Sequence, residues 1–388
     1  MPLSPVPAGS STRAAPAPRL LFVDLLRGLA AQVIVLHHIA LYGPLSDTAY
    51  ALAPGTIDFF FGYGRFAVQV FFVVGGFLAA QSLAKAGPIG PRALLGVAVR
   101  RYRRIGFPYL ASLVVAIVAN NVADRFMDHS SISGPPDLTS VLAHVFLLQS
   151  ILGIPAITAG IWYIAVEFQL LVLVFALTGL AQALVRAPLL RFRVQADSLA
   201  HALFGALALS ALFWFNRDKT LDMWAIYFFG SYFLGMLLYR VVQQGKSAWQ
   251  LGVYLLLMCA AVAVDYRPRL LLAAAVGALV YGAAKLGVLD RWPNNAIVAY
   301  CNRTSYSLFL IHFPVCLVVN ALVWHRDLSP VAAVFGMAAA FGASHVAAFL
   351  FHRYVEVPCM RDSRPDLPLP LPVVAAAAAP VDSAARRS

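Results

Sequence analysis

Long apolar stretches, separated by short polar connections, run along nearly the whole chain. Most of them are long enough to cross the ~30 Å hydrocarbon core of a bilayer as a helix. The pattern therefore predicts an all-α protein with about ten transmembrane helices. The predicted spans are 20–42, 59–84, 104–123, 160–184, 199–215, 221–240, 250–265, 270–287, 304–323 and 330–352.

The composition favours a polytopic membrane protein over a soluble one. Of the 388 residues, 61% are hydrophobic and only 12% are charged, and the mean hydropathy is +0.77. Soluble domains are on average about half apolar and about a quarter charged. The four cysteines have neither CxxC nor Cys–His spacing, so we expect small core residues and no metal site.

The formal net charge of +12 is explained by membrane topology and does not indicate nucleic-acid binding. With ten spans, both termini lie on the same side of the membrane. That side collects twenty-one of the 29 Lys and Arg residues, the other side has seven, and Arg27 stays inside the first span. Because basic loops remain in the cytoplasm, both termini are predicted to be cytoplasmic.

The two ends of the chain and one connection differ from the membrane part. Residues 1–19 and 362–388 are rich in Pro and Ala, and we expect disordered cytoplasmic tails there, on either side of a membrane domain over 20–361. Residues 124–159 form the longest predicted external connection. Within it, 137–150 is apolar but too short to span, so it should be re-entrant or lie at the interface.

The segment LRGLAAQVIVLHHI places ionisable side chains inside the first span. Arg27 and His38 are eleven positions apart, which puts them on one helix face and ~16 Å apart along the axis. Asp24 is close enough to pair with Arg27, and His37 points about 100° away from His38. Such groups are commonly functional, although a snorkelling arginine and a packed histidine also explain them.

The segment RRYRRIGFPYL places four arginines in five positions where the third span starts from the cytoplasm. Arg101 and Arg104 share a helix face, as do Arg100 and Arg104. Anchoring against anionic lipid explains the basic charge. It does not explain the use of arginine throughout, because the forked guanidinium is suited to phosphates. A phosphate-bearing cytosolic ligand is therefore a second interpretation.

Three more segments carry polar groups in or beside spans. GIWYIAVEFQ places Glu167 about one and a half turns deeper than Trp162, where it can act in chemistry or pair with an arginine. SYSLFLIHFPV places Ser305 and His312 nearly on one helix face, and RYVEVP places Glu356 near the cytoplasm. Each ionisable group inside a span is a candidate site residue.

Taken in order and spacing, these segments resemble the membrane-bound acyltransferase 3 family, whose members O-acetylate O-antigen, exopolysaccharide and Nod-factor sugars. The resemblance covers about residues 20–361. It includes D-x-L-R followed by His in the first span, FFVVGGF, the arginines of the third span, W-x-x-x-x-E and SYS followed by His. The matching residues are Asp24, Arg27, His38, Arg101, Arg104, Trp162, Glu167, Ser305, Tyr306 and His312.

Some positions depart from the family pattern. Gly75 stands where the family has a serine, Tyr163 replaces the serine after the tryptophan, and Phe309 replaces a tyrosine. The sequence EVP at Glu356 lacks the arginine of the family's E-R-P. These departures concern the acceptor contacts more than the core chemistry.

The resemblance implies an enzyme of the cell inner membrane that moves an acyl group from cytosolic acyl-CoA to a hydroxyl of an envelope glycan, a glycolipid or a similar acceptor. Acetyl is the commonest acyl group in the family. Acyl-CoA enters as a co-substrate, and no bound cofactor, metal or nucleic acid is implied. The remaining partner is the lipid bilayer.

The resemblance also implies roles for the matching residues. His38 would be the general base or a transient acyl carrier, because histidine titrates near neutral pH. Arg27 would stabilise the thioester oxyanion or orient the donor, and Glu167 would orient a histidine or bind the acceptor. The donor phosphates are assigned to Arg100, Arg101 and Arg104, and supporting or acceptor contacts to Asp24, Trp162, Ser305, Tyr306 and His312.

Two other classes of protein also place polar groups in membrane spans. A secondary transporter would have an intramembrane Arg, His and Glu site, but such proteins commonly carry inverted repeats, which this sequence lacks. A lipid-binding or scaffold protein has no use for an intramembrane His and Glu. Glycan, peptidoglycan, glycolipid and small metabolites remain alternative acceptors for the enzyme.

Overall fold

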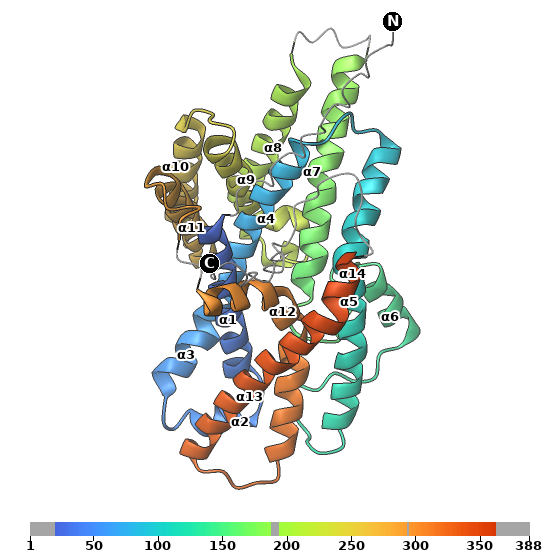
Figure 1. Cartoon of the computed structure of the whole chain (residues 1–388), viewed down its shortest axis with the longest axis vertical. Helices are drawn as coiled ribbons and strands as arrows, with labels where there is room; N and C mark the ends of the chain where they lie inside the picture. The colour runs from blue at the N-terminus through green and yellow to red at the C-terminus, as the bar shows by residue number, and fades with distance from the viewer. Residues whose placement is uncertain (1–19, 188–193, 293–294, 362–388) are drawn as a thin grey trace, which may run out of the picture.

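The computed structural model describes residues 20–187, 194–292 and 295–361, where every regular element is helical (Figure 1). The segments predicted to be tails, 1–19 and 362–388, lie outside the described residues. The helices are α1 (Leu21–Leu41), α2 (Pro44–Ala49), α3 (Pro54–Tyr63), α4 (Val68–Leu83), α5 (Pro91–Ala123), α6 (Leu138–Val145), α7 (Trp162–Arg186), α8 (Ala196–Phe213), α9 (Ala225–Val242), α10 (Trp249–Val264), α11 (Pro268–Lys285), α12 (Ala296–Val323), α13 (Pro330–Phe351) and α14 (Val357–Arg361). A π-helical turn over His352–Glu356 joins α13 to α14.

The chain is a polytopic membrane protein, as the hydrophobic pattern predicts. In the described part of the chain, nine helical segments are long and apolar enough to cross a membrane. The predicted span 250–265 corresponds to α10, which has 16 residues and is therefore about 24 Å long, less than the ~30 Å of a hydrocarbon core. The cytoplasmic placement of both termini depends on ten crossings and stays a prediction.

Two helices of the site begin earlier than the hydrophobic pattern predicts. α5 starts at Pro91, a residue favoured in the first helical turn, and continues for 33 residues. The arginines at 100–104 therefore lie inside a helix, about three turns from its start. α12 starts at Ala296 because the side chain of Asn295 caps it, accepting a hydrogen bond from the Val298 amide at 2.8 Å.

The connection after α5 returns into the bundle. The hydroxyl of Tyr102, on α5, donates to the carbonyl of Val145 at the end of α6 across 2.5 Å. The side-chain amide of Gln169, on α7, donates to the carbonyl of Leu147 at 3.3 Å. Both partners lie in the interiors of long helices, so the segment 137–150 packs against α5 and α7; its placement as re-entrant or at the interface stays a prediction.

The helices α4 and α9 cross closely, and the crossing depends on two glycines. A Cβ at Gly76 would lie 1.8 Å from the carbonyl oxygen of Tyr232, and a Cβ at Gly235 would lie 1.8 Å from that of Val73. Any side chain at either position would force the helices apart. The motif FFVVGGF thus brings α4 against α9. These two helices form one wall of the cavity described below.

The two ends of the helical bundle differ in the helices and connections that lie there. In Figure 1, α2, α3 and the α12–α13 connection lie at one end, and the α4–α5 connection and the end of α7 lie at the other. By the predicted topology, the first end is external and the second is cytoplasmic. α1, α4, α5, α7, α9 and α12 surround the cavity described next.

Candidate active site

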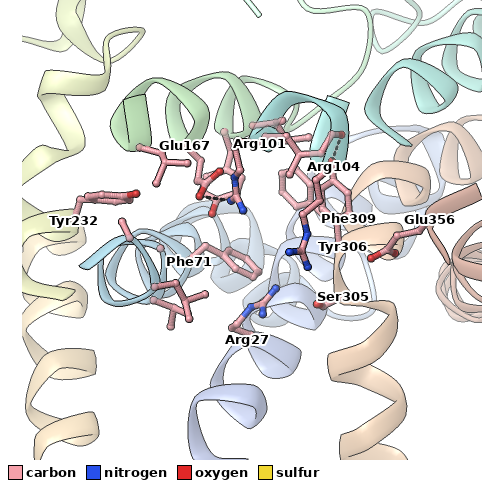
Figure 2. Close-up of a pocket in the computed structure, with 18 of the residues that line it drawn as sticks. Arg27, Phe71, Arg101, Arg104, Glu167, Tyr232, Ser305, Tyr306, Phe309 and Glu356 are labelled. Atoms are coloured by element: carbon pink, nitrogen blue, oxygen red, sulfur yellow. Dashed lines mark hydrogen bonds and ion pairs between the residues drawn. The ribbon is translucent and has the colours of Figure 1, made fainter. Parts of the chain in front are cut away.

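A cavity of about 100 Å³ lies between the helices in the described part of the chain. Figure 2 shows polar side chains from several helices pointing into it. Its lining residues are Arg27, Phe71, Val74, Gly75, Leu78, Ala79, Arg101, Arg104, Ile105, Tyr163, Ile164, Glu167, Leu171, Tyr232, Ser305, Tyr306, Phe309, Glu356 and Met360. Three arginines and two glutamates therefore meet in one mostly apolar cavity.

The two glutamates already have partners. Arg101, on α5, donates to an oxygen of Glu167, on α7, at 2.5 Å (Figure 2), with side-chain exposures of 15% and 9%. Glu167 therefore takes the arginine-paired alternative of the two that the sequence allows. Glu356 accepts hydrogen bonds from the Ser307 hydroxyl at 2.5 Å and from Nδ1 of His352 at 2.9 Å.

Arg27 and Arg104 approach the cavity from opposite sides. The side chain of Arg27 extends from α1 and that of Arg104 from α5, and their guanidinium groups point toward each other (Figure 2). Arg104 is buried. Among the described residues, an ion pair is seen for Arg101 but none for Arg27. The two guanidinium groups converge on a space suited to an anion.

Ser305 and Tyr306 also line the cavity, but their hydroxyls are engaged. The Tyr306 hydroxyl donates to the carbonyl of Ile105 at 2.6 Å, which ties α12 to α5. The Ser305 hydroxyl donates to the carbonyl of Asn302 at 2.8 Å, within its own helix. Both residues therefore shape the wall through backbone contacts.

Two histidines from distant parts of the sequence form a buried pair. Nδ1 of His38, on α1, lies 2.6 Å from Nε2 of His312, on α12. Their rings are stacked, with centroids 4.9 Å apart and an interplanar angle of 12°. His37 points elsewhere, and its Nδ1 donates to the carbonyl of Phe60 at 2.9 Å. The structure thus separates His38 from His37, as the helical spacing predicts.

A layer of three rings lies between the cavity and the histidine pair. Phe71, Tyr163 and Phe309 all line the cavity, with ring centroids 5.6 to 6.3 Å apart. The ring of Phe309 is also 6.3 Å from that of His312. His38 and His312 do not line the cavity, so these rings form its boundary on the side of the histidines. We call Phe71, Tyr163 and Phe309 the aromatic layer.

The backbone at Gly160 touches both sides of this boundary. Gly160 has φ +81°, and a Cβ there would lie 3.3 Å from Cζ of Phe309 and 3.4 Å from Cε1 of His38. The backbone conformation favours glycine, and a Cβ would press lightly on the Phe309 ring and touch His38. Gly160, two residues before Trp162, thus lies against both Phe309 and His38.

Three expected site residues belong neither to the cavity lining nor to the histidine pair. Arg100 lies along its own helix, beside Gly96. Trp162 stacks on Phe228 with centroids 5.4 Å apart, and Asp24 is buried on α1 without lining the cavity. These three are supporting residues by position.

The structure adds two site residues that the sequence analysis did not single out, although Phe71 opens the FFVVGGF motif. Phe71 and Tyr232 line the cavity, and the buried Tyr232 hydroxyl has no hydrogen-bond partner among the described residues. Tyr232 is one of many aromatic residues on α9, and no spacing distinguishes it. A deep unpartnered donor in a cavity is a candidate ligand contact.

Fold and site together define a helical membrane protein with an arginine-lined cavity beside a buried histidine pair. The sequence pattern of a family described as an acyltransferase domain matches residues 20–349. The chain belongs to the acyltransferase 3 family of membrane proteins and is an acyltransferase. This membership favours the enzyme over the transporter and scaffold alternatives. No curated protein and no solved structure matches the chain.

Proposed function

We propose that this acyltransferase moves an acyl group, acetyl in the simplest case, from acyl-CoA to a hydroxyl of an envelope glycan or a similar acceptor. One observation carries the proposal: the arginine-lined cavity ends at an aromatic layer, and a histidine pair lies directly behind it. The anion-binding arginines and the candidate base thus follow one another along the axis of α1.

The arginines support a donor that carries phosphates. Arg27 and Arg104 converge from two helices, so both can contact one phosphate group. Arg101 is neutralised by Glu167 and has a smaller share in this role. Arg100, which lies outside the cavity, would meet only a part of the donor that extends into the cytosol.

The distance along α1 separates the tasks of Arg27 and His38. The two residues are ~16 Å apart along the helix axis, too far to act on one carbonyl group. Arg27 is therefore better suited to orienting the donor than to stabilising the oxyanion. The pantetheine arm of CoA also holds its thioester away from its phosphates, which matches an arrangement with phosphates at Arg27 and thioester near His38.

The reaction itself needs a base at the acceptor hydroxyl. His38 would take the hydroxyl proton as the oxygen attacks the thioester carbonyl carbon. The carbon–sulfur bond then breaks, an ester forms, and the proton passes from His38 to the leaving thiolate. Atoms and charge balance without a metal or an acyl-enzyme intermediate.

The direct test uses the purified protein in nanodiscs with radiolabelled acetyl-CoA and extracted envelope glycans. We expect label in the glycan fraction, and none with the His38→Ala variant. Mass spectrometry of glycans from cells with and without the protein gives a second measurement. Equal acylation in both cells, together with no transfer in nanodiscs from acetyl-CoA or longer acyl-CoA, would contradict the proposal.

A further inference from the structure

The hydrogen bonds of the histidine pair determine where its protons lie. Nδ1 of His312 is 2.9 Å from the carbonyl oxygen of Leu308, four residues earlier in α12. A carbonyl can only accept, so Nδ1 of His312 must carry the hydrogen. In a neutral imidazole the other nitrogen then holds a lone pair. Nε2 of His312 is therefore an acceptor.

The same reasoning determines which nitrogen of His38 carries the hydrogen. The atom 2.6 Å from Nε2 of His312 is Nδ1 of His38, and an acceptor needs a donor opposite it. Nδ1 of His38 thus carries its hydrogen, and the lone pair of the neutral ring is on Nε2. No hydrogen bond among the described residues engages Nε2 of His38, so this nitrogen is available for a proton.

The surroundings hold this arrangement in place. His312 is 0% exposed and His38 is 8% exposed, so water does not compete for the bond between them. His38 also contacts the ring of Tyr42, with centroids 5.8 Å apart, and Gly160 closes over its Cε1. A rotation of either ring would break a buried hydrogen bond, which is costly.

We propose that His312 is a positioning residue, which fixes His38 as the Nδ1–H tautomer and so makes Nε2 of His38 the base nitrogen. The chain of bonds runs from the Leu308 carbonyl through His312 to His38. An orienting group on the far nitrogen of a catalytic histidine is a general requirement of base catalysis. The catalytic part of this inference rests on the proposed function, whereas the tautomer does not.

Two variants at position 312 separate positioning from packing. His312→Gln keeps a side-chain oxygen that can accept from Nδ1 of His38, and His312→Leu fills the space with no acceptor. We expect kcat to fall on the order of a hundredfold in His312→Leu, the range of a lost general base, with the KM for acyl-CoA unchanged. His312→Gln should recover most of this loss.

The tautomer is measured without turnover, by ¹⁵N and ¹³C NMR of histidine-labelled protein in nanodiscs. The His38 signals are those that disappear in His38→Ala. We expect Nδ1–H in the wild type and in His312→Gln, and a mixture of tautomers in His312→Leu. An Nε2–H tautomer in the wild type, or an unchanged tautomer in His312→Leu, would overturn the inference. If the tautomers are as expected but neither the wild type nor any variant transfers acyl groups, the proposed function fails and the tautomer assignment stands.

Discussion

Arg101 and Glu167 form an ion pair at 2.5 Å between α5 and α7, inside the cavity that is proposed to bind the donor. The pair joins two helices and also sets the charge of the cavity, because it neutralises one of the three arginines. It therefore connects the stability of the bundle to the binding of an anionic ligand.

Breaking this pair from one side should destabilise the protein. Glu167→Gln leaves a buried arginine without its counter-charge, a loss of about 3–5 kcal/mol for buried pairs. The double variant Arg101→Leu/Glu167→Leu removes both charges and should be more stable than Glu167→Gln. Thermal unfolding in detergent measures this. A Glu167→Gln variant as stable as the wild type would show that the pair contributes little.

His38 should be essential for transfer and His37 should not. His38 faces His312, whereas His37 is bonded to the Phe60 carbonyl. We expect His38→Ala to abolish acyl transfer and His37→Ala to keep most of it. Transfer is measured with labelled acyl-CoA at matched protein amounts. Equal losses in the two variants would refute the assignment of the base.

Arg104 should bind donor phosphate through its fork. Arg104→Lys keeps the charge but loses bidentate geometry, so we expect weaker use of acyl-CoA by about 1–3 kcal/mol. Titration of acyl-CoA in nanodiscs measures the effect.

Arg103 is the matched control for this experiment, because it neighbours Arg104 on the same helix but is exposed and does not line the cavity. Arg103→Lys should leave the dependence on acyl-CoA unchanged. The phosphate-binding role fails if the two lysine variants behave alike.

Gly160 should be required for the position of His38. Gly160→Ala adds a Cβ against Phe309 and His38, whereas Gly153→Ala, in the same loop and with φ +66°, meets nothing within 4 Å. Both variants bear the left-handed backbone cost of about 1–2 kcal/mol, so Gly153→Ala controls for that part of the loss of stability. Only Gly160→Ala should lower kcat, measured against the Gly153→Ala control. Equal kcat in the two variants would mean that this contact has no catalytic importance.

The predicted topology places Ser130 outside and Ser383 inside the cell. Cysteines introduced at these positions into a cysteine-free variant should react with an impermeant maleimide from opposite sides of the membrane. Ser130 is exposed, so access is not limited by packing. Reaction of both from one side would require an odd number of crossings.

Helical periodicity carried much of the prediction for the site. It placed Arg27 and His38 on one face of the first span, and the structure has Arg27 in the cavity and His38 behind its aromatic layer. It could not predict which helices touch. The partner of His38 is 274 residues away, and a pairing at that separation depends on the packing of α1 against α12.

The start of α5 shows a second limit. Hydropathy alone placed the span at 104–123, because the arginines lower the average, but the helix begins at Pro91. The arginines are helical, and Arg101 and Arg104 face the cavity, so their charge does not end the helix. A hydropathy average measures how well a segment suits contact with lipid. It therefore does not detect helical residues whose polar side chains face the protein interior.

The aromatic layer of Phe71, Tyr163 and Phe309 has a consequence for the cell as a whole. An arginine-lined passage open at both ends would conduct anions and dissipate the membrane potential. Three rings in contact present a single hydroxyl, that of Tyr163, to a hydrated ion, and a phosphate would have to shed most of its water to pass them. A short uncharged acyl group bears no such cost. On the proposed function, the layer would act as an insulator that an acyl group can cross and its charged carrier cannot, and removing the ring in Phe309→Ala should make proteoliposomes leak chloride.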